Sequence, residues 1–242
     1  MSIKDKIKNI TPEMIEWRHA IHERPEVAYQ EENTSLFISN KLREFDIEVH
    51  QGIGKTGIVG VIHGKENEGP KKSIGIRADI DALPMTEKTN LPYASKNEGS
   101  MHACGHDGHT TMLLGAAKYL SETRNFHGTV YCIFQPAEEG GNAGAKAMIN
   151  DGLFKKFEID TVWGIHNWPG IPVGDAVIHE GFAMAGGDII VITVEGKGGH
   201  AAQPQFSNDP MVAAGLTITA LQSLISRQLD PFKNAVLSLT KI

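Results

Sequence analysis

Cysteine, clustered basic residues and long apolar runs are all scarce in this sequence. The 242 residues include two cysteines, too few for a disulfide framework, and Cys132 is expected to be a small core residue. The start of the chain lacks the apolar run of a signal peptide, and no uncharged apolar stretch is long enough to cross a bilayer. The formal net charge is -6 without dense blocks of Lys or Arg, which argues against nucleic acid as a partner. We therefore expect a cytoplasmic protein that binds neither membrane nor nucleic acid.

Short apolar runs alternate with helical patterns along most of the chain. With 40% apolar and 21% charged residues, the sequence can form one large domain or two modest ones. Strands are expected at 47–50, 57–62, 73–77, 130–134 and 161–165, and helices at 11–25, 33–45, 109–120 and 143–149. The first helix is expected to begin at Thr11, because a hydroxyl cap followed by Pro12 is typical of a helix start. This alternation predicts an α/β domain with a largely parallel sheet covered by helices on both faces.

The character of the sequence changes near Gly181, where a stretch of small residues begins. A strand at 188–195, a helix at 209–228 and a strand at 235–242 are expected after it. A two-stranded piece of this kind cannot bury both faces of its sheet alone. We therefore interpret it as the first part of a second domain.

The segment from His102 to His109 concentrates side chains that bind metals: three histidines, a cysteine and an aspartate lie within eight residues. Cys104-Gly-His106 directs two donors toward a common point, and Gly105 removes a side chain that would crowd them. A thiolate beside an imidazole suits zinc, manganese, cobalt or nickel better than calcium or magnesium. A structural zinc site would need four cysteine or histidine ligands, but there is no second cysteine cluster. The other donors are therefore expected to be carboxylates or imidazoles, as in catalytic sites.

Other polar side chains follow the ends of predicted strands, where the functional groups of α/β sheets collect. They are Asp79 and Asp81, Glu138 and Glu139, and His166. In an adjacent pair of glutamates, one carboxylate can bind a metal while its neighbour takes a proton from water. The pair therefore supplies what a catalytic metal site needs.

Each of these residues also has a purely structural interpretation. The glutamate pair could stabilise the N-terminus of a helix, and His166 could be a hydrogen-bonded core histidine. Asp79 and Asp81 could be turn residues, and Asp107 could cap the helix that follows it. A fold without metal, in which the cysteine and histidine side chains only pack, is a further alternative.

Taken together, these residues lie in motifs that resemble those of the hippurate hydrolase, N-acyl-amino-acid amidohydrolase and indoleacetyl-amino-acid hydrolase family of dinuclear metallopeptidase-like enzymes. The motifs occur in family order from about residue 18 to the end of the chain. They are His19/His22-x-x-Pro25-Glu26, Arg77-Ala-Asp-Ile-Asp-Ala-Leu-Pro84-Met85, His102-Ala-Cys-Gly-His-Asp-Gly-His109, Gln135-Pro-Ala-Glu-Glu-Gly140, Gly164-Ile-His-Asn-Trp-Pro169 and Gly196-Lys-Gly-Gly-His-Ala-Ala202.

The resemblance implies an α/β, zinc-peptidase-like fold with a mixed, largely parallel sheet flanked by helices. Residues 1–183 would belong to the catalytic domain. Residues 184–242 would form the first half of a ferredoxin-like α+β lid or dimerisation domain. Family members carry one more metal-ligand histidine after the lid, whereas this chain ends at Ile242, so we expect a C-terminally truncated chain.

The resemblance also implies roles for individual residues. The implied ligands of two divalent metal ions (Mn, Zn, Ni or Co) are Cys104, His106, Glu139 and His166. Glu138 would be the general acid/base, and Asp79 would orient a metal ligand. His200, in the lid, would reach the substrate and stabilise the oxyanion. The other members of the metal-binding segment, His102, Asp107 and His109, are expected to support the site or to start the helix.

The activity implied by the resemblance is hydrolysis of the amide bond of N-acyl amino acids, hippurate-like or acetylated. The implied assembly of the full-length enzyme is a homodimer or a larger homo-oligomer. A catalytically inactive remnant that binds metal is the alternative function.

Overall fold

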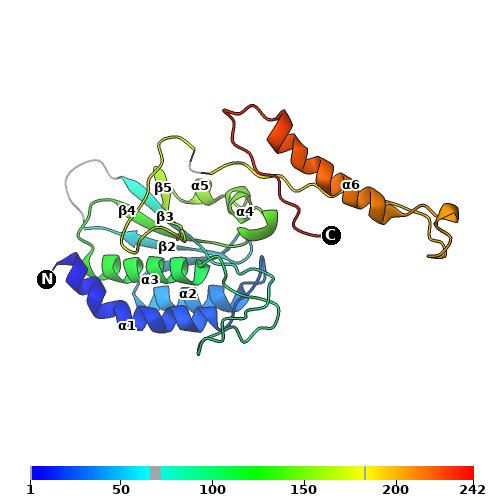
Figure 1. The fold of residues 1–242 in the computed structure, drawn as a ribbon. Coiled ribbons are helices and arrows are strands. Elements are labelled where there is room, and N and C mark those ends of the chain that lie inside the picture. The colour runs from blue at the N-terminus through cyan, green and yellow to red at the C-terminus, as the bar shows by residue number, and fades with distance from the viewer. Residues whose placement is uncertain (1, 66–71, 183) are drawn as a thin grey trace. The chain divides into compact units, whose positions relative to one another are not determined.

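The computed structural model describes residues 2–65, 72–182 and 184–242, and the chain divides into two compact units, Met1–Gly170 and Ile171–Ile242 (Figure 1). The helices of the first unit are α1 (Ile3–His22), α2 (Glu32–Glu44), α3 (His106–Thr123), α4 (Gly144–Asn150) and α5 (Leu153–Lys156), with a 3-10 helical turn, η1 (Glu139–Gly141). Its strands are β1 (Glu48–Ile53), β2 (Gly57–His63), β3 (Ser73–Asp79), β4 (Thr129–Gln135) and β5 (Thr161–Gly164). The helices and strands expected in this unit are confirmed, except for the start of α1.

The strands form one mixed sheet in the order β1-β2-β4-β3-β5. β3 runs parallel to β4 and β5, whereas β2 runs antiparallel to β1 and β4. The mixed sheet is confirmed, but "largely parallel" is correct only for its β4-β3-β5 half. Ile53 pairs with Gly57, and so short a link between β1 and β2 permits only an antiparallel hairpin. β3 and β4 are joined through α3, which gives the long crossover that parallel strands need.

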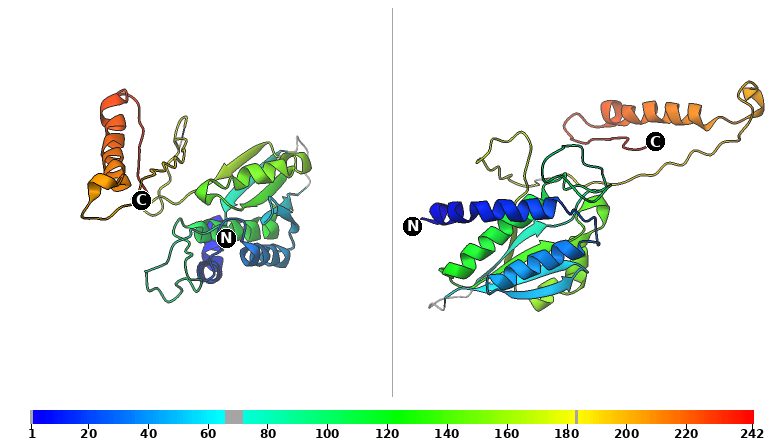
Figure 2. Two further views of the ribbon diagram at one scale, coloured as in Figure 1. Left: turned by 90° about the vertical axis from the view of Figure 1, so that its right-hand side faces the viewer. Right: turned by 90° about the horizontal axis from the view of Figure 1, so that it is seen from below.

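Helices cover both faces of this sheet, and α1, α2 and α3 lie together over the strands in the view from below (Figure 2). On their face, Trp17 of α1 packs in one core with Cys132 and Phe134 of β4. Met148 of α4 and Leu153 of α5 belong to a second core with residues of β2 and β4. Because alternate side chains of β2 and β4 enter different cores, these two strands are largely apolar. Cys132 is fully buried, as predicted.

α1 begins at Ile3 rather than at Thr11, so the expected start of this helix is wrong. The Ser2 hydroxyl accepts a hydrogen bond from the Asp5 backbone N–H at 3.2 Å, and the Asp5 carboxylate accepts one from the Ser2 backbone N–H at 3.0 Å. This capping box supplies hydrogen-bond partners for the first backbone N–H groups of a helix that begins eight residues before Thr11. The Thr11 hydroxyl instead donates to a carbonyl of the preceding turn, and Pro12 lies inside the helix without ending it.

In the second unit, the 3-10 turn η2 (Pro204–Phe206) is followed by α6 (Pro210–Ser223), which continues into a π-helical turn, η3 (Leu224–Gln228). The predicted helix is confirmed, and Asp209 caps it by accepting a hydrogen bond from the Met211 N–H at 2.9 Å. Among the helices described in either unit, none is both long and apolar enough to cross a bilayer.

The two strands predicted on either side of α6 are wrong. Within the described part of the second unit, residues 188–195 and 235–242 form no ladder, and the apolar side chain of Ile190 is 78% exposed. A strand needs a partner for its backbone N–H and C=O groups. The described residues of this unit offer only the isolated bridge between Lys197 and Asn208. The ferredoxin-like lid and its boundary therefore stay predictions.

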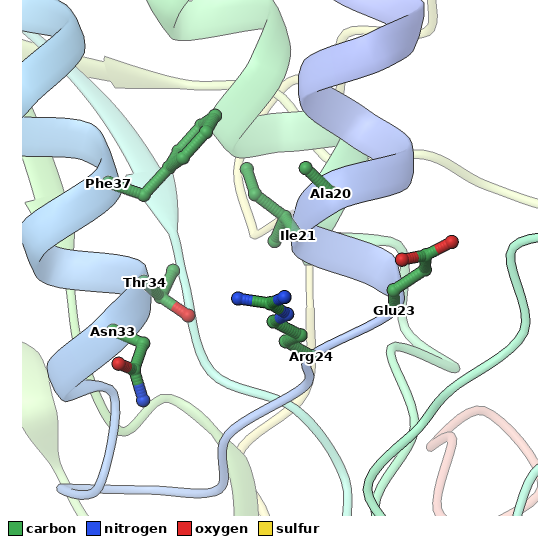
Figure 3. A pocket seen from close by; sticks show the side chains of 7 residues that line it. All are labelled: Ala20, Ile21, Glu23, Arg24, Asn33, Thr34 and Phe37. Carbon is green, nitrogen blue, oxygen red and sulfur yellow. The ribbon is translucent and has the colours of Figure 1, made fainter.

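A surface pocket lies between the end of α1 and the start of α2 (Figure 3). Its lining residues are Ala20, Ile21, Glu23, Arg24, Asn33, Thr34 and Phe37. The backbone N–H groups of Asn33 and Thr34 already donate to the Glu26 carboxylate, at 3.1 and 2.8 Å, so the start of α2 has no free donors there for an anion. The lining includes no predicted site residue, and we assign this pocket no function.

We expect Leu114→Ala to lower the free energy of unfolding by about 2–5 kcal/mol, because Leu114 of α3 is fully buried in the core and its truncation leaves a cavity. Urea unfolding followed by circular dichroism measures the change. Met112→Ala is the matched control. Met112 lies in the same helix but is 47% exposed, so its truncation should change stability by only about 0.5 kcal/mol. Equal losses in the two variants would contradict the buried face described for α3.

Candidate metal centre

The parallel pairing of β3 with β4 and β5 brings the ends of three strands to one edge of the sheet. Asp79, at the end of β3, lies opposite Gln135 of β4, and Arg77 lies opposite Gly164 of β5. The segments that leave these strands are therefore neighbours. They carry the predicted site residues Asp79, Asp81, Glu138, Glu139 and His166.

The start of α3 supplies the remaining donors. Gly105 is the N-cap of this helix and has a φ of 85°, in the left-handed region. A Cβ atom at Gly105 would lie 2.4 Å from the Asn167 side-chain oxygen, on the segment that follows β5. Glycine is therefore required here for the backbone angle and for space. It lets Cys104 and His106 flank a backbone that passes close to the end of β5.

Cys104, His106 and Glu139 form one group of donors, with ligand atoms within 4.8 Å of one another. The Nδ1 of His106 lies 2.8 Å from the Asp81 carbonyl oxygen, so Nδ1 donates to that carbonyl and Nε2 is the ring nitrogen left to bind a metal. That Nε2 is buried without a hydrogen-bond partner among the described residues and lies 3.8 Å from the equally unpartnered Oε1 of Glu139. Two buried polar atoms that face each other without a hydrogen-bond partner fit a metal ion, which would bind both.

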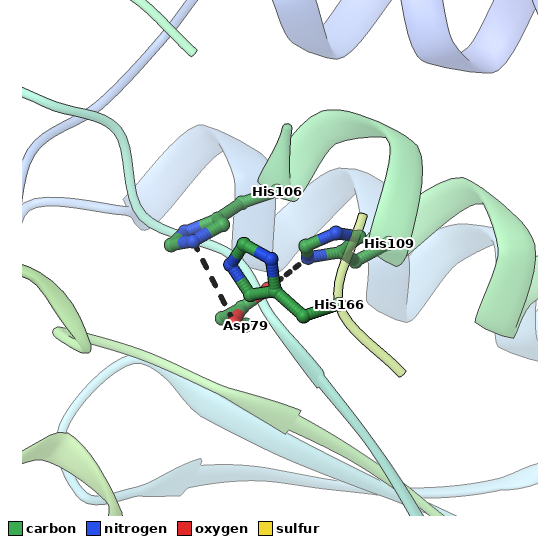
Figure 4. Close-up of side chains that lie close together, drawn as sticks. All are labelled: Asp79, His106, His109 and His166. Carbon is green, nitrogen blue, oxygen red and sulfur yellow. Dashed lines mark hydrogen bonds and ion pairs between the residues drawn. The ribbon is translucent and has the colours of Figure 1, made fainter. Parts of the chain in front are cut away.

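Asp79, His106, His109 and His166 form a second group of donors, drawn in Figure 4. The Nδ1 of His109 lies 2.6 Å from Asp79 Oδ1, and His106 Nε2 lies 3.6 Å from Asp79 Oδ2. The Nε2 of His109 accepts a hydrogen bond from the Asn167 backbone N–H at 3.0 Å. His109 thus links Asp79 to the segment that carries His166.

Asp81 and His109 take part in the site, although neither is in the ligand set that the resemblance implies. Asp81 bonds His106 through its carbonyl, and its Oδ2 accepts the Glu139 backbone N–H at 2.9 Å. The spacing of both residues from predicted site residues could have indicated their place in the site. His106 and His109 are three residues apart on a helix, and Asp79 and Asp81 are two apart in extended chain, so each pair shares a side.

Several of the structural alternatives are wrong. His166 is not a core histidine, because it is exposed and its Nε2 lies 3.5 Å from the Cys104 Sγ. Asp79 and Asp81 are almost fully buried and bonded to histidines, unlike turn residues. The carboxylate of Asp107 does not cap α3.

Asp107 belongs instead to a buried polar cluster. One of its oxygens lies 2.9 Å from His22 Nδ1 and 3.0 Å from Arg18 Nε, and His22 Nε2 lies 3.3 Å from Glu87. The His102 ring lies 6.3 Å from that of His22, and burial lowers the pKa of His102 to about 4. His102 is therefore neutral near pH 7. This cluster ties α1 and the segment after β3 to the start of α3, which is a supporting role.

Burial and neighbouring charges set the protonation of the donors. Burial alone would raise the pKa of Asp79, but the hydrogen bond from His109 and the charge of His106 hold it at about 2. Burial and the charge of Glu139 raise the pKa of the Cys104 thiol to about 12. Burial also raises the pKa of Glu139. The cluster is short of positive charge, which a divalent cation would supply while favouring the thiolate.

Glu138 and His200, the predicted catalytic residues, lie in different units. Glu138 is the exposed N-cap residue of η1. It directly precedes the donor Glu139 in the chain, and its charge adds to the effect of burial in raising the pKa of Glu139. His200 lies in the second unit, where its Nδ1 accepts a hydrogen bond from the Ala202 N–H at 3.1 Å. The roles of both residues stay predictions.

Thiol, imidazole and carboxylate donors at the carboxyl edge of an α/β sheet are typical of a metallohydrolase rather than of a structural zinc site. The family model of peptidase family M20/M25/M40 matches residues 75–231, a range that includes all the donors described above. The chain belongs to this family. The resemblance inferred from the motifs is thereby confirmed.

Three curated relatives illustrate the range of the family. Hippurate hydrolase of Campylobacter jejuni is 51% identical over 239 residues, which cover 99% of this chain and 61% of that protein. N-acetyl-L-cysteine deacetylase of Bacillus subtilis is 45% identical, with 98% and 56% covered. An IAA-amino acid hydrolase ILR1-like protein of Arabidopsis thaliana is 43% identical, with 96% and 52% covered. The chain thus spans 52% to 61% of the length of these relatives.

Two solved structures share the fold. A putative aminohydrolase from methicillin-resistant Staphylococcus aureus superposes with a TM-score of 0.76 at 36% identity, covering 98% of this chain and 62% of that one. A dinuclear metal-binding peptidase of the M20 family from Bacillus subtilis gives a TM-score of 0.64 at 44% identity, covering 69% and 46%.

We expect the chain to bind a divalent metal ion, and His106→Ala to weaken that binding by at least about 100-fold, because His106 belongs to both donor groups. Competition with a chromophoric chelator, using zinc or manganese, measures the affinity. His63→Ala is the control, since His63 is an exposed residue of β2 whose ring bonds only the Thr129 hydroxyl in the described contacts. A folded His106→Ala variant with unchanged affinity would remove the basis for this centre.

Proposed function

We propose that the protein is a metal-dependent amidohydrolase that cleaves the amide bond of N-acyl amino acids, hippurate-like or acetylated. The observation that carries the proposal is the convergence of Cys104, His106 and Glu139 within 4.8 Å, with a second glutamate, Glu138, adjacent in the chain. Similarity to a hippurate hydrolase and to an N-acetyl-L-cysteine deacetylase supports this class of substrate. Because the chain spans 61% of the length of the first of these, the activity is proposed for the whole protein.

Two divalent metal ions, drawn from Mn, Zn, Ni and Co, are the proposed cofactors. The proposed ligands are Cys104, His106, Glu139 and His166. The unpartnered Nε2 of His106 and Oε1 of Glu139 support this assignment, as does similarity to a peptidase described as dinuclear and metal-binding. When bound, the ions would polarise the scissile carbonyl and make water a stronger acid.

Glu138 is the residue proposed to move protons. Its carboxylate oxygen takes a proton from the attacking water and then gives that proton to the nitrogen of the leaving amine. Its exposed position beside Glu139 supports this role, because the carboxylate is free to meet a substrate.

Asp79 is the residue proposed to orient the imidazoles. With a pKa of about 2 it is an anion at neutral pH, and it accepts the Nδ1–H of His109 at 2.6 Å. A carboxylate that fixes the direction of a neighbouring imidazole in this way keeps the donors in place between turnovers.

His200 is proposed to stabilise the negative charge that develops on the carbonyl oxygen, acting from a lid to which residues 184–242 contribute. Its place in the Gly-Gly-His motif supports this proposal. A homodimer or larger homo-oligomer of the full-length protein, in the cytoplasm, belongs to the same proposal.

We expect the protein loaded with Mn or Zn to release amino acid from hippurate or from acetylated amino acids, and Glu138→Gln to lower kcat by about 10²- to 10⁴-fold. The amide cannot accept a proton from water, whereas metal content should stay unchanged because Glu138 is not a proposed ligand. Chromatographic assay of the released amino acid measures turnover. Glu98→Gln, at another exposed carboxylate, is the control.

Two outcomes would count against the proposal. Normal turnover in Glu138→Gln would show that another group moves the proton. Metal binding without release of amino acid by the wild-type protein would favour the alternative, a catalytically inactive metal-binding protein.

A further inference from the structure

Glu31 is a buried carboxyl group that the proposed mechanism does not use. It lies at the start of α2 as the N-cap residue, with an exposed fraction of 0%. Burying a carboxyl group is unfavourable unless its oxygens find hydrogen-bond donors. Both oxygens do so here: Oε1 accepts the Ala137 backbone N–H at 2.9 Å, and Oε2 accepts the Thr56 hydroxyl at 2.6 Å. Glu31 therefore joins the start of α2 to the segment that leaves β4.

Ala137, the partner of Glu31, immediately precedes the two glutamates of the centre. It is fully buried and has a φ of 50°, in the left-handed region that residues with a Cβ atom rarely occupy. A residue keeps such a conformation only where its surroundings hold it. The bond from its N–H to Glu31 and the bond from the Gly144 N–H to its carbonyl, at 3.0 Å, hold it on both sides. Glu31 thus fixes the point at which the chain turns toward Glu138.

The same turn is anchored at two further points. The Glu139 N–H donates to Asp81 Oδ2 at 2.9 Å, and the Tyr29 hydroxyl donates to the Asn142 carbonyl at 2.8 Å. The backbone on either side of Glu138 is therefore held by two carboxylates. One belongs to the segment that follows β3, and the other, Glu31, belongs to the connection between α1 and α2.

Capping of α2 does not explain the burial of Glu31. The side chain of Glu31 makes no capping hydrogen bond. The carboxylate of Glu26 fills that function, because it accepts the backbone N–H groups of Asn33 and Thr34.

We propose that Glu31 is a positioning residue of the metal centre: through Ala137 it sets the place of Glu138 and Glu139 relative to the donors at the start of α3. Its effect on turnover rests on the proposed function. Its effects on the hydrogen-exchange protection of residues 137–142 and on metal affinity do not depend on that function. Both can be measured whether or not the protein hydrolyses amides.

The test is Glu31→Ala in the full chain, which leaves the Ala137 N–H buried without its acceptor. Metal affinity and kcat should each fall by about 10- to 100-fold, as when other residues that orient ligands are removed. KM should change by less than about threefold, because Glu31 does not contact substrate. Amide hydrogen exchange in a peptide covering 137–142 should accelerate by about tenfold or more.

Three variants separate positioning from general loss of stability. Glu31→Gln should restore most of the affinity and slow exchange, since its amide oxygen can accept the Ala137 N–H and its NH2 group can donate to Thr56. Glu26→Ala is the matched control, because it removes the cap of α2. It should lower Tm without altering metal affinity, kcat or exchange at 137–142. Thr56→Val, which removes only the donor to Oε2, should accelerate exchange there in the same direction as Glu31→Ala.

The outcomes decide between the two proposals. No turnover by the wild-type protein would sink the proposed function, but exchange and metal affinity would still test Glu31. A folded Glu31→Ala variant with wild-type exchange at 137–142 and wild-type affinity would overturn the inference. Equal losses in Glu31→Gln and Glu31→Ala would also overturn it, because charge rather than hydrogen-bond geometry would then matter. If Glu31→Ala does not fold, unchanged exchange in Thr56→Val decides against the inference.

Discussion

β3 lies between β4 and β5, and its parallel hydrogen bonds to both strands fix where three segments of the chain leave the sheet. Asp79 is paired with Gln135, so the turns that follow β3 and β4 begin side by side. A slip of one residue in this register would move the Asp79 side chain to the opposite face of the sheet. The apolar cores on both faces hold the register, because the same slip would exchange the residues that fill them. The register that packs the two cores is thus the same register that places the site residues.

Possible metal ligands gather at the edge of the sheet where these segments meet. A buried nitrogen of His106 and a buried oxygen of Glu139 lie 3.8 Å apart without hydrogen-bond partners among the described residues, and the Cys104 thiol has its pKa raised to about 12. An arrangement of this kind is unfavourable in a protein without a cation, since buried polar atoms lose their hydrogen bonds to water and gain none in return. The surrounding fold holds it in place: Asp81 orients His106, and His109 ties Asp79 to the segment after β5. The free energy that this arrangement costs is offset by the packing of the rest of the sheet and its helices.

The parts that could be predicted from the sequence are those in which local pattern and tertiary environment agree. Strands buried on both faces read as short apolar runs, and the Cys104-Gly-His106 cluster marks a metal site because few other functions need those residues together. Prediction was wrong where two local solutions compete, as at the start of α1, or where an apolar run has no partner, as at 188–195. The contact between Glu31 and Ala137 joins residues 106 positions apart, and no periodicity carries a signal for such a pair.

The unpaired segment from Asp188 to Glu195 has a further consequence for the behaviour of this chain in solution. Its apolar side chains are exposed, and its charges stand only at the two ends. β-branched residues whose N–H and C=O groups have no backbone partner among the described residues are a template onto which a second chain can add a strand. Asp188 and Glu195 then act as gatekeepers, because stacking copies in register would bring like charges together. Low salt, where this repulsion is least screened, is the condition under which the chain should be easiest to keep from aggregating.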